Sequence, residues 1–159
     1  MSSLTDYCRG PGVLRLHGGV QHYAWGSTDF IPELIGEANP DGEPYAELWL
    51  GAHPDRPSEV ELGAAQVSLD RLVAGCPERL LGATTAQRYR ELPYLFKVLS
   101  AAVPLSIQAH PTREQAEAGY AREEASGIPA SAPRRNYKDT NHKPEALVAL
   151  TEFHALRGF

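Results

Sequence analysis

The sequence predicts a mainly β protein, a sandwich or jelly roll with short helical additions. Many short apolar runs have the length of strands, turns rich in glycine and proline separate them, and few segments have helical patterning. The 159 residues suffice for one domain with a real core. The net charge of −5 argues against a nucleic-acid surface, and no apolar run approaches the length of a membrane span. We therefore expect neither nucleic acid nor a membrane as partner.

The first half of the chain is predicted to alternate short strands with short helices after an N-terminal tail over 1–12. Expected strands cover 13–23 (one or two, around Gly18-Gly19), 46–52 and 58–62, and expected helices cover 30–36, 68–74 and 84–92. Ser68 is the expected N-cap of its helix. Asn39-Pro40-Asp41-Gly42 predicts a turn, because Asn and Asp bond their own backbone and Gly accepts positive φ.

The second half is predicted to contain more strands and one clear helix. Further strands are expected over 105–110, 146–150 and 153–156, and a helix over 112–125. Thr112 and Gln115 have the spacing of a capping box at its start. Residues 95–102 are apolar except for Lys97 and Ser100, which predicts a strand buried on both faces.

Three residues have types and positions that suit a metal site. Gln108 and His110 are two apart in a predicted strand, so their side chains share a face, and Glu145 begins the next apolar run. An amide oxygen, an imidazole and a carboxylate can together hold a divalent metal such as zinc. Three ligands are one fewer than a tetrahedral zinc set. The chain also stops just after a strand-like run, which we interpret as a cut end.

The chain has three lysines, Lys97, Lys138 and Lys143, against twelve arginines. All three lie beside or within the blocks that carry the candidate ligands. Lysine can lose its proton when desolvated and offers a point charge to a phosphate, although chance in a small sample is the alternative explanation. A lysine in an apolar strand, as at position 97, requires an anion or a cavity.

The cysteines and the N-terminus indicate a cytoplasmic protein. Cys8 and Cys76 lie far apart and match no metal spacing, so we expect two free thiols in a reducing compartment. Residues 1–12 lack the apolar core of a signal peptide.

Five blocks together resemble type I mannose-6-phosphate isomerase. They are YAWGS at 23–27, AELWLGAHP at 46–54, LPYLFKVL at 92–99, LSIQAHP at 105–111 and NYKDTNHKPE at 136–145. They follow the family's order and spacing from about Val20 to Phe159. One departure is Ala109, where the family usually has a larger apolar residue; its side chain should face away from a metal.

The resemblance implies a cupin-like jelly roll, incomplete at its C-terminus, with 13–159 as the N-terminal part of a cupin-type catalytic domain. It implies one zinc per chain, bound by Gln108, His110 and Glu145, with a second His from further along as the missing fourth ligand. The implied reaction interconverts mannose 6-phosphate and fructose 6-phosphate through an enediol. We expect a monomeric full-length protein with a phosphorylated sugar as substrate, and little activity from this chain alone.

The resemblance also makes His142 and Lys143 substrate-site residues, and the positions of other side chains suggest roles for them. Lys143 and His142 are the candidate proton shuttles, and the sequence does not decide between them. Lys97, Trp25, Glu47 and His53 are candidate substrate-binding residues, although each also suits a structural role. Trp49 is interpreted as packing, and Arg134 and Arg135 as loop charges.

Two other functions compete with the isomerase. A cupin module without catalytic activity would bind a metal or a sugar and not turn it over. A metal-dependent dioxygenase would require two His and one carboxylate with open positions, and Gln108 in place of a His argues against it.

Overall fold

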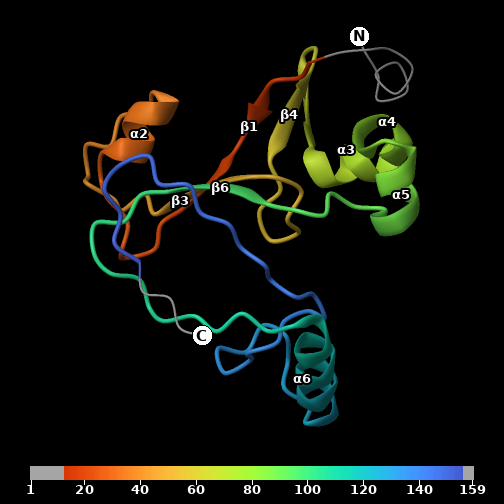
Figure 1. Cartoon of the computed structure of the whole chain (residues 1–159). Coiled ribbons are helices and arrows are strands. Elements are labelled where there is room, and N and C mark those ends of the chain that lie inside the picture. Colours follow the sequence, from red (N-terminus) through yellow and green to blue (C-terminus); the bar gives the residue numbers. More distant parts are fainter. Residues whose placement is uncertain (1–12, 156–159) are drawn as a thin grey trace. The chain divides into compact units, whose positions relative to one another are not determined.

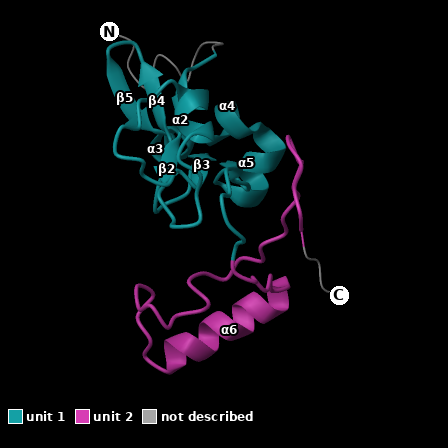
Figure 2. Cartoon of the chain, turned by 90° about the vertical axis from the view of Figure 1, so that its left-hand side faces the viewer, with its two compact units in different colours: residues 1–105 teal, residues 106–159 magenta. Residues whose placement is uncertain are grey.

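The computed structural model describes residues 13–155 (Figure 1). The tail predicted over 1–12, Cys8, and the end of the strand predicted over 153–156 lie outside the described residues. The chain divides into two compact units, Met1–Leu105 and Ser106–Phe159 (Figure 2), and each is described by itself. In the described part, no helix is long and apolar enough to cross a membrane.

Unit 1 contains two small antiparallel sheets. The first has the order β1-β4-β5, with β1 at Leu16–His17, β4 at Glu59–Leu62 and β5 at Ala65–Ser68. The second has the order β2-β3-β6, with β2 at Gly19–Gln21, β3 at Glu47–Leu50 and β6 at Phe96–Leu99. The sequence left open whether 13–23 forms one strand or two, and the structure has two, β1 and β2. A Cβ at Gly18 would lie 2.7 Å from the Leu48 side chain and 2.8 Å from the Trp49 carbonyl oxygen, so only glycine lets the chain pass that close to β3.

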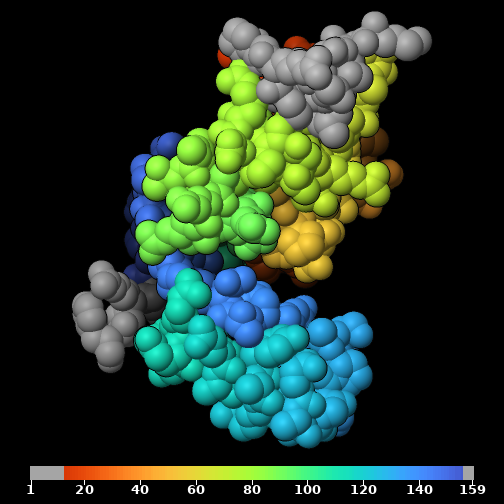
Figure 3. Space-filling view, turned by 90° about the vertical axis from the view of Figure 1, so that its right-hand side faces the viewer, coloured from red at the N-terminus to blue at the C-terminus, as the bar shows by residue number. Residues whose placement is uncertain are grey.

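Four short helices complete the described part of unit 1, and α3 to α5 form much of the surface seen in Figure 3. They are α2 at Phe30–Ile35, α3 at Leu69–Gly75, α4 at Pro77–Leu81 and α5 at Ala83–Tyr89. Gly36 ends α2 as predicted, with φ at 72°. Ser68 precedes α3 but its side chain does not cap it; the hydroxyl bonds Asp70 instead. β5 and α4 have no counterpart in the sequence prediction.

The core of unit 1 forms where α3 packs against the β1-β4-β5 sheet. Val60, Leu62, Leu72 and Cys76 make one buried cluster. Burying a large aliphatic side chain contributes about 1.5–3 kcal/mol, so this cluster is the main link between helix and sheet. Cys76 is disulfide-bonded, so the prediction of a free thiol there is wrong.

Unit 2 is organised around α6, at Arg113–Ala125. The predicted capping box is confirmed, because Thr112 and Gln115 bond each other's backbone N–H reciprocally. The predicted strands are absent: 105–110 and 146–150 form no strand, and Ile107 and Val148 are 97% and 84% exposed. A strand requires a neighbour for its backbone hydrogen bonds, and no such neighbour lies within the described part of unit 2.

The general class of short antiparallel strands with added helices is therefore confirmed in unit 1. The described helices nevertheless contain more residues than the described strands. The described strands are short, and the strands expected beyond residue 105 are not formed. The cupin-like jelly roll stays a prediction.

Candidate functional site

Three polar or aromatic side chains meet on one face of the β2-β3-β6 sheet. Glu47 and Trp49 are two residues apart on β3, and Lys97 on β6 pairs directly with Trp49, so all three share a face. The indole Nε1 of Trp49 donates to Glu47 Oε2 at 2.5 Å. Lys97 Nζ lies 3.6 Å from the same carboxylate oxygen and 5.1 Å from the centroid of the indole ring.

The sequence analysis expected an anion or a cavity beside Lys97, because this lysine lies in an apolar strand. Glu47 is that anion, and it is buried. The prediction of a strand buried on both faces is wrong, however. Phe96, next to Lys97, is 58% exposed, and the Lys97 side chain is about one third exposed. The opposite face of β6 is thus open to solvent at its first residue.

Aromatic rings extend this cluster. The His53 ring lies edge-on to Trp49 with 4.9 Å between centroids, and Tyr23 stacks on Trp25 at 5.8 Å. The pKa of Tyr23 is raised, first by partial burial and then by the negative charges of Glu47 and Asp55. Three predicted substrate-site residues of unit 1, namely Lys97, Glu47 and His53, are thereby connected through Trp49, which was not predicted to act there. The sequence did contain one indication of this role for Trp49: it is two residues after Glu47 in a predicted strand, so the two side chains share a face.

Two of the three predicted metal ligands meet in unit 2. His110 Nε2 lies 3.1 Å from Glu145 Oε2, and both side chains are partly exposed. Gln108 makes no hydrogen bond to either of them among the described residues, and its predicted position rested on a strand that is absent. The described residues contain no group of three or more His, Cys, Asp or Glu that could hold a metal. The predicted ligand set contains only two such residues.

The two candidate proton shuttles have partners of their own. Arg113 approaches His142 Nδ1 at 3.3 Å. The Lys143 ammonium lies 2.8 Å from Asp139 Oδ2, and the Lys143 side chain is 54% exposed. The Lys143 side chain is therefore not desolvated in this structure.

The sequence analysis interpreted Arg135 as a loop charge, and this interpretation is wrong. The Arg135 guanidinium is fully buried and forms an ion pair with Glu123 on α6. Arg134, its neighbour, is exposed. Arg135 thereby anchors to α6 the start of the segment that leads to Glu145.

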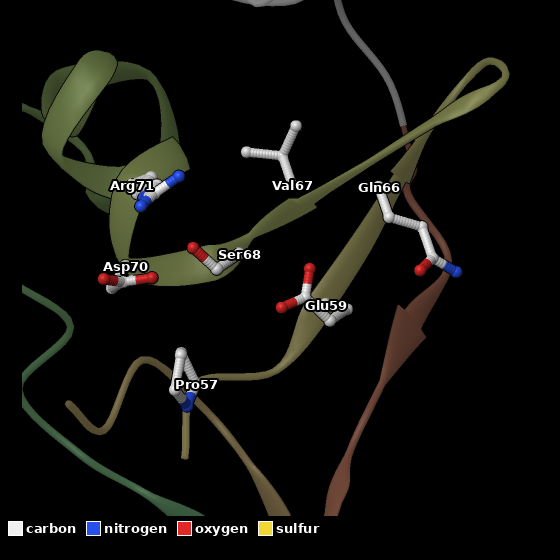
Figure 4. A pocket seen from close by; sticks show the side chains of 7 residues that line it. All are labelled: Pro57, Glu59, Gln66, Val67, Ser68, Asp70 and Arg71. Atoms are coloured by element: carbon white, nitrogen blue, oxygen red, sulfur yellow. The ribbon is translucent and has the colours of Figure 1, made fainter. Parts of the chain in front are cut away.

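A surface hollow of about 440 Å³ lies elsewhere in unit 1, between β4, β5 and the start of α3 (Figure 4). Its lining comes from Pro57, Glu59, Gln66, Val67, Ser68, Asp70 and Arg71. None of the predicted site residues is among them.

The family is shown by comparison with known proteins. A family profile described as phosphomannose isomerase type I, catalytic domain, matches residues 13–159. The chain belongs to this family. The resemblance inferred from the five sequence blocks is thereby confirmed.

Curated relatives cover much of this chain but extend well beyond it. The mannose-6-phosphate isomerase of Escherichia coli K12 is 51% identical over 146 residues, which are 91% of this chain and 37% of that protein. The Homo sapiens mannose-6-phosphate isomerase is 38% identical over 158 residues, covering 94% of this chain and 35% of the relative. This member of the type I phosphomannose isomerase family thus spans just over a third of their length.

Solved structures of the family agree with the fold. The mannose 6-phosphate isomerase of Salmonella typhimurium bound to fructose 6-phosphate and zinc has a TM-score of 0.74 at 50% identity, covering 82% of this chain and 33% of that one. A zinc-bound mannose 6-phosphate isomerase has a TM-score of 0.75 at the same identity, covering 81% and 33%.

Proposed function

We propose that this chain forms part of a zinc-dependent isomerase that interconverts mannose 6-phosphate and fructose 6-phosphate. Membership of the type I phosphomannose isomerase family supports the reaction class. The relative solved with fructose 6-phosphate and zinc supports both the substrate and the metal. The observation in this chain that carries the proposal is the contact between His110 and Glu145.

The geometry of that contact fits two ligands of one zinc ion. Nitrogen and oxygen ligands lie about 2.0–2.1 Å from tetrahedral zinc, which places two ligand atoms roughly 3.3 Å apart. The His110 and Glu145 atoms are separated by 3.1 Å, and both remain accessible from solvent. Gln108, two residues before His110, is the proposed third ligand through its amide oxygen.

A zinc ion held by two neutral ligands and one carboxylate would keep much of its charge and polarise a carbonyl oxygen as a Lewis acid. The remaining work falls to the protein's own side chains. The isomerisation moves a proton between C2 and C1 of the open-chain sugar, so a group whose pKa lies near the working pH must carry it.

His142 and Lys143 stay the candidates for this proton transfer. Arginine has only donors, so the contact from Arg113 makes His142 Nδ1 an acceptor and leaves the ring proton on Nε2. In that tautomer Nε2 can donate a hydrogen bond, and His142 would take up a proton only at Nδ1, after Arg113 has moved away from it. Lys143 would first have to leave Asp139. In unit 1, Lys97 is the proposed point charge for the substrate's anionic groups, beside Glu47, Trp25 and His53.

The metal assignment is tested with a matched pair of substitutions. His154 lies 3.2 Å from Glu152 and forms a second His–carboxylate contact in the same unit, but with both side chains almost fully exposed. His110→Ala should lower bound zinc, measured by elemental mass spectrometry, by at least about tenfold, while His154→Ala should leave it unchanged. Equal zinc content in both variants would contradict the assignment of His110.

The reaction is tested by a coupled assay with mannose 6-phosphate and added zinc. The assay uses this chain and the longest protein that its gene encodes. Conversion to fructose 6-phosphate is expected from the longest product. If that product binds zinc and does not isomerise the sugar phosphate, the isomerase proposal fails and the binding module without catalytic activity is favoured.

A further inference from the structure

We propose that Trp49 is a positioning residue that keeps the Lys97 ammonium available to an anionic ligand by occupying the Glu47 carboxylate. The inference rests on the proposed function only for the identity of that ligand, a phosphate or sugar oxygen. The arrangement of the three side chains itself comes from the sheet.

The first step concerns which atom bonds the carboxylate. Trp49 Nε1 is 2.5 Å from Glu47 Oε2, whereas Lys97 Nζ is 3.6 Å from that same oxygen. Hydrogen bonds from nitrogen to oxygen span about 2.7–3.2 Å. The indole therefore holds the hydrogen bond to Oε2, and the ammonium is attracted by charge at a longer distance.

The second step concerns what holds the ammonium. Lys97 Nζ lies 5.1 Å from the centroid of the Trp49 ring, within the range of about 6 Å in which the face of an indole attracts a cation. Neither the ring nor a carboxylate oxygen at 3.6 Å uses an N–H donor of the ammonium. Within the described part of unit 1, Lys97 Nζ has no hydrogen-bond acceptor, so its donors are free for a ligand.

The third step concerns burial. Glu47 and Trp49 are 7% and 9% exposed, and a buried carboxylate without a partner is costly. Without the indole N–H, the nearest replacement donor is Lys97 on the neighbouring strand. The ammonium would then be drawn into a direct bond with Glu47 and would be less available to a ligand.

Trp49→Phe tests this, because it keeps an aromatic ring and removes the N–H. The measurement is trace acetylation of the intact chain followed by peptide mass spectrometry. With only three lysines in the sequence, Lys138 and Lys143 serve as internal references. A direct charge-assisted bond to Glu47 should lower the labelling rate of Lys97 by about three- to tenfold relative to Lys138.

Adding Glu47→Gln to Trp49→Phe separates positioning from packing. Removal of the negative charge should restore Lys97 labelling to at least its original rate. If Trp49 only filled space, Trp49→Phe would loosen the sheet and raise Lys97 labelling, and Glu47→Gln would not reverse the change. Either of those results overturns the proposal. Trp25→Phe, whose ring contacts Tyr23, should leave Lys97 labelling unchanged.

Kinetics on the longest gene product distinguish this inference from the proposed function. If the inference and the isomerase are both correct, Trp49→Phe raises KM for mannose 6-phosphate more than it lowers kcat. Changed Lys97 labelling in a protein without isomerase activity would support the positioning role and contradict the proposed function. A raised KM with unchanged Lys97 labelling would contradict the positioning role alone.

Discussion

Arg135 and Glu123 form a buried ion pair in unit 2, with Nε of the guanidinium 3.1 Å from Oε2 of the carboxylate. Glu123 also accepts hydrogen bonds from the backbone N–H groups of Asn136 and Tyr137. Arg135 in turn donates to the carbonyl oxygen of Tyr137. These bonds connect α6 to the start of the segment that carries Glu145, so they are expected to hold that segment in place.

Arg135→Met should destabilise unit 2 strongly. Removing one partner of a buried ion pair leaves the other charge uncompensated, which costs about 3–5 kcal/mol. Thermal unfolding followed by circular dichroism, together with hydrogen exchange of the α6 amides, measures the effect. Arg134→Met removes the same charge one residue earlier at an exposed position and should change stability little. Similar losses in the two variants would show that the buried pair has no special role.

Unit 2 should lose stability in acid because of Glu123. The pKa of this carboxyl lies below its ordinary value of 4.5, chiefly because the backbone N–H of Tyr137 donates to it. A lowered pKa in the folded state means that the stabilisation is complete above pH 4.5 and disappears as the pH falls through the folded-state pKa.

Hydrogen exchange of α6 measured from about pH 7 to about pH 3 tests this dependence. Glu123→Gln should remove most of the acid dependence and lower stability at neutral pH. Glu117→Gln, on the exposed side of the same helix, should keep the dependence. An unchanged acid profile in Glu123→Gln would assign the titration to another group.

Gly119→Ala should destabilise α6 packing, although alanine usually favours a helix. A Cβ at this position would lie 2.5 Å from ring atoms of Tyr137. Overpacking costs about 1–3 kcal/mol, more than the roughly 0.5–1 kcal/mol that alanine gains in a helix interior. Thermal unfolding is the measurement. Ala118→Gly, at an exposed neighbour, should cost only the helix propensity, and a more stable Gly119→Ala variant would contradict the close contact.

Gly26→Ala should displace the loop that carries Trp25. The added Cβ would lie 2.5 Å from the backbone nitrogen and 2.6 Å from the Cα of buried Ala46, and backbone atoms cannot rotate away. We expect a loss of about 1–3 kcal/mol and a change in tryptophan fluorescence.

Gly42→Ala is the control for that substitution. Its Cβ would meet nothing within 4 Å, but φ is 63°, so it should cost only the strain of a left-handed backbone, about 1–2 kcal/mol. Its fluorescence should match the original protein. The steric explanation fails if Gly26→Ala also leaves the fluorescence unchanged.

The sequence by itself determined the elements whose stabilising contacts are a few residues apart. The capping box that begins α6 links positions 112 and 115, and the left-handed Gly36 ends α2. The turn at 39–42 is likewise confirmed, because the Asn39 side chain bonds the backbone of Glu43. In each case the contact lies within the segment, so the local sequence contains the information that decides the structure.

The individual candidate site residues also stood out in the sequence, because their types are unusual in their surroundings or lie in the family blocks. Lys97 stood out in an apolar strand, and the family blocks singled out Glu47, His110 and Glu145. Their partners were not recognisable. Trp49 bonds Glu47 within β3 and lies opposite Lys97 on β6. The position opposite Lys97 depends on the register between the two strands, which the local sequence of neither strand specifies.

Only the tertiary structure decided which apolar runs became strands and which charges became buried. Residues 96–99 form a strand because β3 lies beside them, whereas 105–110 and 146–150 were also expected to be strands and form none. Arg135 is buried and Arg134 is exposed because α6 presents Glu123 to one and not to the other. Backbone pairing and charge burial both require a partner that is distant in the sequence, and local residue patterns carry no information about where that partner lies.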